Sequence, residues 1–207
     1  GSLLVEMSTI DPLESDALRA ELAHHDVAMV DAPVGRTSEH AHRGTLLIMA
    51  GGDPDDLERC RILFDAVGEV TVDCGGPGKG IRTKIVNNYM SAALNVLSAE
   101  ALVLAEASGL DVHRTLEVLA GTPAGRGHFT TTYPGKALAG DTTPAFRLRL
   151  ARKDLAIGVS LAEAVGVVPR VGNVALEAYR DEETKGRGDE DWTALYAATR
   201  EAALPTT

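Results

Sequence analysis

Short apolar runs typical of β-strands are confined to the first third of this chain, where they alternate with segments of helical spacing. The four runs are LLVEM (Leu3–Met7), VAMVDAPV (Val27–Val34), TLLIMA (Thr45–Ala50) and EVTV (Glu69–Val72). Strand–helix–strand alternation of this kind predicts an α/β layered domain. The pattern ends at a glycine-rich stretch, Gly75–Gly80, beyond which no segment has the composition of a strand.

Helical segments account for the remainder of the chain. Apolar residues recur at helical spacing in five stretches, namely Ile81–Ser108, Asp111–Ala120, Phe146–Val165, Val171–Arg180 and Asp191–Ala203. This change of character predicts an α/β part at residues 1–78 and an all-helical part at residues 79–207. Because about four strands are few for a complete nucleotide-binding sheet, we expect the first part to be a partial one.

Four polar residues share one stripe of the first of these helices. Lys84, Asn87, Asn88 and Ser91 stand at i, i+3, i+4 and i+7 within GGPGKGIRTKIVNNYMS, Gly75–Ser91. Burying such groups costs free energy unless they are paired, so a bound polar substrate is one interpretation. In it, Lys84 donates to a carbonyl oxygen while Asn88 holds the lysine or a substrate hydroxyl. A snorkelling lysine with capping amides is the alternative, and the spacing leaves both open.

Polar loops follow the first two strands, at the carboxyl ends where ligands of open α/β sheets bind. Gly35, Arg36 and Thr37 follow the second strand, and a guanidinium among small and hydroxyl-bearing residues suits a planar or tetrahedral anion. Thr9 follows the first strand, where its hydroxyl meets a cofactor or caps the next helix. Lys153 lies inside a later helix. An ordinary polar turn for Arg36 and a surface position for Lys153 are the alternatives.

The glycine-rich stretch before the long helix resembles a phosphate-binding loop without matching one. Gly76-Pro-Gly78-Lys-Gly80 fails the G-x-G-x-x-G pattern because Ile81 stands at the last position, and Lys79 is followed by glycine rather than Ser or Thr. The sequence therefore predicts no phosphate cradle of its own.

Bulk properties exclude several classes of protein. A formal net charge of −10 argues against nucleic-acid partners and anionic membrane surfaces. Cys60 and Cys74 have no metal or redox spacing, and His40 with His42 is more typical of a solvated loop than of a metal site. We expect no metal. No secretory signal or transmembrane span is predicted, so the cytoplasm is the expected location.

Five short motifs in a fixed order resemble the β-hydroxyacid dehydrogenase family. They are MSTI-x-P (Met7–Pro12), DAPV (Asp31–Val34), GTL (Gly44–Leu46), G-x-G-x-x-x-K-x-x-N-N (Gly78–Asn88) and KDL (Lys153–Leu155). The family includes 3-hydroxyisobutyrate and tartronate-semialdehyde reductases. The resemblance implies a Rossmann-type domain, here its C-terminal part at residues 1–78. It also implies an all-α domain at residues 79–207 like the C-terminal domain of 6-phosphogluconate dehydrogenase.

The resemblance also implies roles for individual residues. Lys84 would protonate the carbonyl oxygen as hydride arrives from a nicotinamide, and Asn88 would help position the substrate. Thr9 and Lys153 would approach the cofactor, which is expected to be NADH, with NADP left open. The family implies a homo-dimer or homo-tetramer, and the abundance of apolar helix after Gly80 favours the same conclusion.

One departure from the family pattern concerns the substrate. The usual Ser-Gly-Gly after DAPV is replaced by Gly35-Arg36-Thr37. Together with NNYMS and GRGHFTT (Gly125–Thr131), this resembles the branch that reduces 3-sulfolactaldehyde to 2,3-dihydroxypropane-1-sulfonate. Arg36, Asn87 and Ser91 would then surround the sulfonate. Succinic or tartronate semialdehyde remains the alternative substrate, since Arg36 suits a carboxylate as well.

A second departure concerns the cofactor half. A family member begins with a strand and G-x-G-x-x-G, and neither precedes Leu3 here. We therefore expect the main NADH-binding half to be absent and this chain alone to bind NADH poorly. A fragment, a gene without its usual start, and a partner supplying that half are the open explanations. A cofactor-free module for assembly or anion binding is the non-enzymatic alternative.

Overall fold

The computed structural model of the chain describes residues 1–122, 125, 127–164, 166 and 168–204. Two compact units divide between Asn87 and Asn88. This point lies inside helix α4 (Lys79–Ala107), which continues for 29 residues because no glycine or proline interrupts it after Gly80. The compact division thus differs from the change in composition at residue 78, and the domain bounds drawn from the sequence stay a prediction.

The first unit contains the strands. Strand β1 (Leu3–Glu6) runs parallel to β2 (Ala28–Asp31). Strand β3 (Val34–Gly35) is antiparallel to β4 (Leu46–Ala50), which is parallel to β5 (Gly68–Asp73). The run predicted as one strand, Val27–Val34, is therefore split. Pro33 has no N–H for a sheet ladder, and the chain passes from one sheet to the other at that residue.

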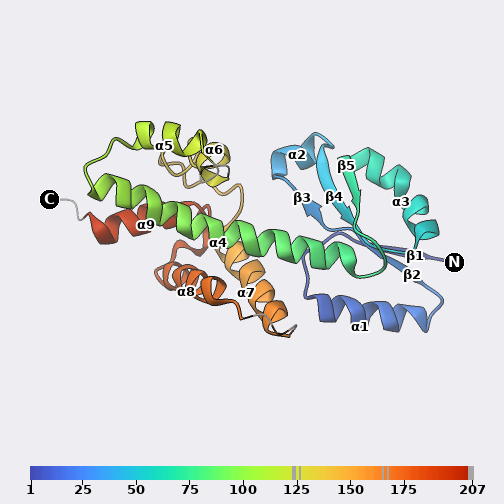
Figure 1. Cartoon of the computed structure of the whole chain (residues 1–207). Coiled ribbons are helices and arrows are strands. Elements are labelled where there is room, and N and C mark those ends of the chain that lie inside the picture. Colours follow the sequence, from blue (N-terminus) through green and yellow to red (C-terminus); the bar gives the residue numbers. More distant parts are fainter. Residues whose placement is uncertain (123–124, 126, 165, 167, 205–207) are drawn as a thin grey trace. The chain divides into compact units, whose positions relative to one another are not determined.

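Helices cover both sides of these strands. Helix α1 (Pro12–Ala23) and helix α3 (Pro54–Val67) lie on opposite sides of the strands in Figure 1. Each begins with a proline after an aspartate, a pattern typical of helix starts. The α/β fold of the first part is thereby confirmed. The short helix α2 (Ser38–His42) falls in the loop after β3, where five residues carry no apolar period.

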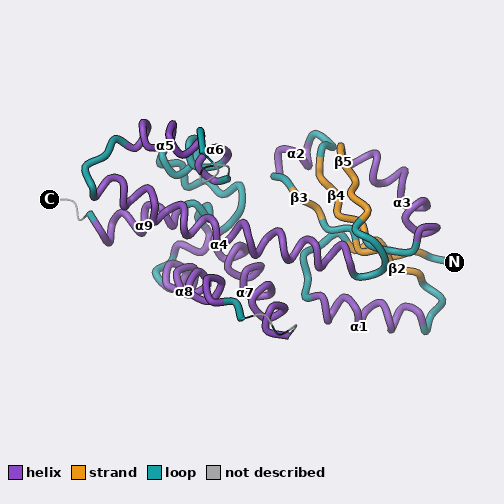
Figure 2. Tube along the Cα trace, in the orientation of Figure 1, coloured by secondary structure: helices purple, strands orange, loops and turns teal. Residues whose placement is uncertain are grey.

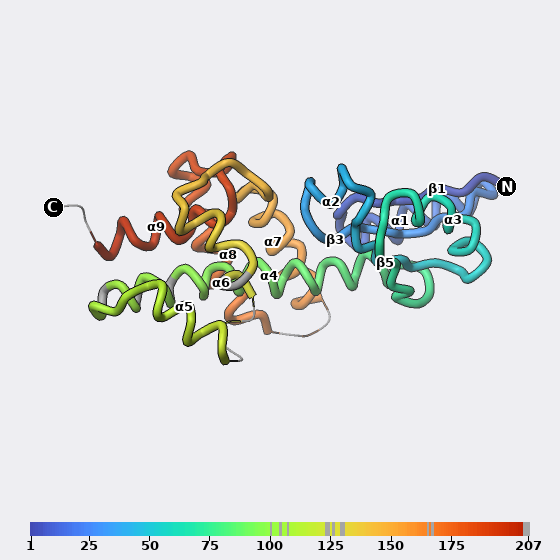
Figure 3. Tube along the Cα trace, turned by 90° about the horizontal axis from the view of Figure 1, so that it is seen from above, coloured from blue at the N-terminus to red at the C-terminus, as the bar shows by residue number. Residues whose placement is uncertain are grey.

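The second unit is helical, and the orange strands of Figure 2 all precede α4. Its elements after α4 are α5 (Val112–Ala120), α6 (His128–Thr131), α7 (Leu148–Ala164), α8 (Arg170–Thr184), a 3₁₀-helix (Arg187–Asp189) and α9 (Ala194–Ala203). Figure 3 shows these elements from above, with α4 continuing from the end of β5. The all-helical C-terminal part is confirmed.

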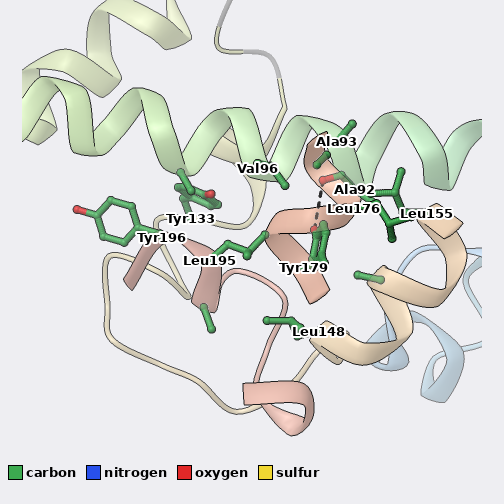
Figure 4. Close-up of a cluster of buried hydrophobic side chains, with 14 of the residues drawn as sticks. Ala92, Ala93, Val96, Tyr133, Leu148, Leu155, Leu176, Tyr179, Leu195 and Tyr196 are labelled. Atoms are coloured by element: carbon green, nitrogen blue, oxygen red, sulfur yellow. Dashed lines mark hydrogen bonds between the residues drawn. The ribbon is translucent and has the colours of Figure 1, made fainter. Parts of the chain in front are cut away.

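Small residues on α4 allow the second unit to pack closely around that helix. Ala92 and Val96 lie against Leu176 and Tyr179 of α8 in a buried cluster that includes leucines of α7 (Figure 4). The Tyr179 hydroxyl donates to the Ala92 carbonyl at 3.2 Å. It accepts from Nδ2 of Asn95, also buried, at 3.0 Å. The middle of α4 is therefore fixed from within the second unit.

Candidate active site

The predicted polar stripe lies on a continuous α-helix. Lys84, Asn87, Asn88 and Ser91 all belong to α4, so their spacing puts them on one side of it. Asn87 is exposed, whereas Lys84, Asn88 and Ser91 are half-buried. Half-buried polar groups along one side of an otherwise apolar helix need polar partners, and the structure identifies several of them.

A buried carboxylate lies at the start of α4, ahead of the stripe. Asp31, at the end of β2, is fully buried, and its side chain accepts hydrogen bonds from the backbone N–H groups of Gly78 (2.7 Å) and Ile81 (2.8 Å). Arg19 of α1 donates to the same carboxylate at 2.9 Å. A negative group at a helix N-terminus is favoured by the helix dipole. Asp31 thus occupies the position that a phosphate takes in a glycine-rich nucleotide loop.

The glycines of this turn serve close packing. A Cβ on Gly80 would lie 2.4 Å from the Met49 carbonyl oxygen and 2.5 Å from that of Asp31. No larger residue fits there without moving β2 or β4. This explains why the motif approaches a phosphate-binding pattern and then departs from it. The turn does not fit a pyrophosphate, since the N–H groups of Gly78 and Ile81 are already satisfied by Asp31.

An ion-pair cluster holds α4 against α1. Arg82 Nη2 donates to Asp16 Oδ2 at 2.6 Å, and Arg19 Nη1 contacts Asp16 Oδ1 at 2.9 Å. The hydrogen bond between Arg82 and Asp16 raises the pKa of Arg82 and lowers the pKa of Asp16. The position of the first turns of α4 relative to α1 therefore depends on these charged residues, which were not predicted as site residues.

Arg36 stands at the end of β3 with a left-handed backbone, φ 75°. Its Nη1 donates to the Thr45 carbonyl oxygen at 2.6 Å and forms a very short ion pair with Glu69 at the start of β5. This partner lowers the pKa of Glu69. The predicted anion anchor is thus paired with an internal carboxylate.

The neighbours of Arg36 have local roles. Gly35 pairs with Leu47 in the sheet, and a Cβ there would make ordinary contacts. Thr37 precedes α2, and its hydroxyl lies 2.9 Å from Nδ1 of His40.

Thr9 is half-buried between β1 and α1, but the cap of α1 is Asp11, whose carboxylate accepts from the Leu13 N–H at 2.7 Å.

A buried carboxylate on α7 contacts two of the predicted site residues. Asp154 Oδ2 accepts from Asn88 Nδ2 at 2.5 Å, and Lys153 Nζ lies 2.9 Å from Asp154 Oδ1. The structure therefore brings Asn88 and Lys153 to one carboxylate, although they are far apart in sequence. Asp154 was not predicted as a site residue. Its shared helical face with Ala151 and Leu155 was the available indication that it would be buried.

A histidine contacts the end of the stripe. His128, at the start of α6, is buried, with Nε2 2.8 Å from the Ser91 carbonyl oxygen and Nδ1 2.9 Å from the Thr132 hydroxyl. Since the carbonyl only accepts, Nε2 carries the proton. Burial lowers the pKa of His128. Of the GRGHFTT motif, Arg126 and the side chains of Phe129 and Thr130 lie outside the described residues.

Neither a metal site nor a membrane-spanning helix is found in the part of the chain that the structure describes. No group of three or more His, Cys, Asp or Glu side chains there is arranged to hold a metal ion. No helix among the described residues is long and apolar enough to cross a membrane.

The chain is similar to known protein families and to proteins of known name. Residues 78–199 match the family described as NAD-binding of NADP-dependent 3-hydroxyisobutyrate dehydrogenase, and residues 1–76 match the NAD binding domain of 6-phosphogluconate dehydrogenase. A 3-sulfolactaldehyde reductase of Escherichia coli (strain K12) is 46% identical over 202 residues, which cover 98% of this chain and 68% of the reductase.

More distant proteins agree with these matches. An NAD-dependent L-serine dehydrogenase of Pseudomonas aeruginosa is 31% identical over 201 residues, covering 94% of this chain and 67% of that enzyme. The solved structure of Mycobacterium tuberculosis 3-hydroxyisobutyrate dehydrogenase with L-serine superposes with a TM-score of 0.88 at 28% identity. It covers 96% of this chain and 70% of that one.

Proposed function

Because the chain belongs to the 3-hydroxyisobutyrate dehydrogenase family of NAD(P)-dependent oxidoreductases, we propose that it takes part in the NADH-dependent reduction of a short anionic aldehyde. The substrate we propose is 3-sulfolactaldehyde, and the product is 2,3-dihydroxypropane-1-sulfonate. The observation that carries this proposal is the stripe on α4. Lys84 is followed one turn later by Asn88, and the carboxamide of Asn88 is held by the buried carboxylate of Asp154. The 46% identity to a reductase of that name supports the choice of substrate.

Lys84 is the proposed proton donor. Reduction adds a hydride to the carbonyl carbon and a proton to the carbonyl oxygen, and an ammonium group suits the second step because negative charge develops on that oxygen. Asn88 follows one turn later on α4 and is proposed to position the substrate hydroxyl. This division of roles needs only groups that the helix already presents on one side.

Arg36, Asn87 and Ser91 are proposed to bind the sulfonate, with Gly35 and Thr37 shaping the loop. A sulfonate presents three oxygens in a tetrahedral array. A guanidinium, an amide and a hydroxyl supply donors of different direction, which suits that geometry. In this proposal the substrate anion replaces Glu69 as the partner of Arg36, which keeps the guanidinium neutralised before and after binding.

For the cofactor, we propose NADH, approached by Thr9 and Lys153. When bound, the nicotinamide supplies the hydride. The turn before α4 does not fit the pyrophosphate because Asp31 satisfies the N–H groups of Gly78 and Ile81, so we propose that other residues, outside this sequence, bind that group. Thr9 is half-buried and the side chain of Lys153 is half-exposed, so each can contact a cofactor that lies beside it.

The test compares kcat/KM for 3-sulfolactaldehyde with kcat/KM for succinic and tartronate semialdehydes, using full-length protein that contains this chain. We expect the sulfonated aldehyde to be preferred. Arg36→Ala should reduce that preference by about 10- to 100-fold, the equivalent of one lost charge-assisted hydrogen bond. The control is Arg61→Ala, which removes an exposed arginine paired with Glu58 on α3. Preference for a carboxylated aldehyde would favour the alternative substrates, and an unchanged preference in Arg36→Ala would exclude the role of Arg36.

A further inference from the structure

Asp154 of α7 is a carboxylate whose side chain is only 4% exposed. It belongs to the buried face of α7, together with Ala151, Leu155 and Gly158. An ionised group in such a position costs free energy unless its partners compensate for the loss of water. The residues that contact Asp154 therefore have to explain why a carboxylate is buried at this position.

The two oxygens of Asp154 contact different residues. Oδ2 accepts from Asn88 Nδ2 at 2.5 Å, and Oδ1 lies 2.9 Å from Lys153 Nζ. The second contact is an ion pair without hydrogen-bond geometry, and among the described residues Oδ1 has no partner that meets that geometry. A buried oxygen left partly unsatisfied is uncommon where a group serves stability alone. A neutral residue would pack in this position at lower cost.

A carboxylate that only accepts hydrogen bonds fixes the orientation of the amide beside it. Asn88 must present Nδ2 to Asp154, so its Oδ1, which can only accept, points in the other direction. An amide turned the opposite way would offer N–H groups to the substrate hydroxyl instead of an acceptor. The same carboxylate draws the Lys153 ammonium toward Asn88.

We propose that Asp154 is a positioning residue, which sets the hydrogen-bonding direction of Asn88 and the place of the Lys153 ammonium during aldehyde reduction. The proposal rests on the proposed function, in which Asn88 contacts the substrate. Asp154 acts through Asn88 and Lys153 and does not itself touch the reacting atoms. Removing it should therefore affect turnover more than substrate binding.

The kinetic test uses full-length protein and the variants Asp154→Asn, Asn88→Ala and their combination. We expect Asp154→Asn to lower kcat by about 10- to 100-fold, as losses of orienting partners do, while KM changes by less than about threefold. The combined variant should be no slower than Asn88→Ala by more than about threefold, because Asp154 has lost the amide that it orients. An additive loss, or wild-type kcat in Asp154→Asn, would overturn the proposal.

Asp191→Asn is the matched control, since Asp191 is equally buried in the same unit and accepts hydrogen bonds from the backbone of Ala145, Phe146 and Thr193. It should lower the melting temperature and leave kcat within about twofold of wild type. A fall in kcat that matches that of Asp154→Asn would show a general effect of lost stability and overturn the proposal.

A measurement without turnover separates this proposal from the proposed function. If Asp154 and Asn88 are coupled, the melting temperature of Asp154→Ala with Asn88→Ala should fall by less than the two single falls added together. That result would support the contact even in a protein that reduces no aldehyde. Additive falls would overturn the Asp154–Asn88 pair whatever the substrate proves to be.

Discussion

Arg36 is paired with Glu69 in the structure and, in the proposed function, with the substrate anion. Its guanidinium is 28% exposed, and its present anion is Glu69, which is 58% exposed. An exposed ion pair is weak and exchanges readily, so a substrate anion can take the place of Glu69. If Arg36 anchors the substrate, Glu69 competes with that substrate for the same donors.

Replacing Glu69 by Gln should therefore strengthen substrate binding. We expect KM for the sulfonated aldehyde to fall by about two- to fivefold with kcat unchanged, the range set by the weakness of exposed pairs. Steady-state kinetics of the full-length protein measure both. Glu58→Gln is the control, because it breaks the exposed pair with Arg61 on α3. A rise in KM, or an equal fall for an uncharged aldehyde, would contradict the competition.

His128 makes stability depend on pH. Its folded-state pKa is lowered by burial, against a weaker opposing effect of its hydrogen bond to Ser91 and of Asp191. The unfolded chain takes up a proton near the ordinary histidine pKa of about 6.5, and the folded protein does so only at lower pH. Stability from this residue is therefore complete above about pH 6.5 and decreases as the pH falls below it.

The variant His128→Gln should lose this dependence, since glutamine does not titrate and its amide can still donate to the Ser91 carbonyl. We expect it to be about 1–3 kcal/mol less stable at pH 7.5, because the aromatic contact with Trp192 is lost. The difference from wild type should narrow at pH 5.5. Urea denaturation at both values measures it, with exposed His113→Gln as the control. A difference that is constant with pH would contradict the assignment.

At the level of elements, the start of α4 depends on Asp31. The carboxylate satisfies the N–H groups of Gly78 and Ile81 and pairs with Arg19, all in a buried position. We expect Asp31→Ala to destabilise the protein by about 3 kcal/mol, because buried donors lose their acceptor and the arginine loses its partner. Hydrogen exchange at Ile81 should accelerate by more than the global loss of stability requires.

Urea denaturation measures the loss of stability in Asp31→Ala and in a control variant, and hydrogen exchange measures the opening at Ile81. Asp73→Ala is the matched control, since Asp73 also accepts from a backbone N–H of the same turn, that of Gly75, at 2.8 Å, but is exposed. It should cost less than about 1 kcal/mol. Equal costs for the two substitutions would mean that burial of Asp31 does not strengthen the cap of α4.

Most elements could be predicted from the sequence because their causes are local. Apolar runs located the strands, and the helical spacing of apolar residues located the longer helices after Gly80. The split after Asp31 could not be located, because apolar composition does not reveal which sheet a strand joins. Helix α2 was missed since its five residues have no apolar face.

The candidate site shows the same limit. The spacing of Lys84 and Asn88 was visible because one helix carries both. The contact of Asn88 with Asp154 spans 66 positions, and the buried contacts of Asp31 with the α4 turn span up to 50. Sequence patterns report residues on one element, whereas these pairs depend on how elements pack. This is why the contacts of Asp154 and Asp31 could be identified only in the structure.

At the scale of the whole molecule, an acidic chain is proposed to bind an anion. The formal net charge is −10, so the average field repels an anionic aldehyde, and binding has to rely on local cations such as Arg36 and Lys84. The second unit also exposes large apolar side chains.

The exposed apolar residues lie on α4 and α8 within the second unit. Met90, Leu97, Val171 and Val174 are each at least 58% exposed, and they line one groove with Ala93 and Ala175. Contiguous apolar surface of this kind marks an interface in soluble proteins. The occupant we predict is a second copy of the chain, because a symmetric pair places the same groove on both sides of the contact.

Light scattering coupled to size exclusion tests this prediction. We expect a homo-dimer or homo-tetramer at micromolar concentration, and we expect Leu97→Glu with Val174→Glu to yield a smaller species. A symmetric interface would bury each new carboxylate in both copies of the chain. The cost of removing these charges from water and their mutual repulsion should then prevent association. Val118→Glu is the control, because Val118 is 67% exposed on α5 and is not among the groove residues. A monomeric wild type would refute the prediction, and equal dissociation by Val118→Glu would place the interface elsewhere.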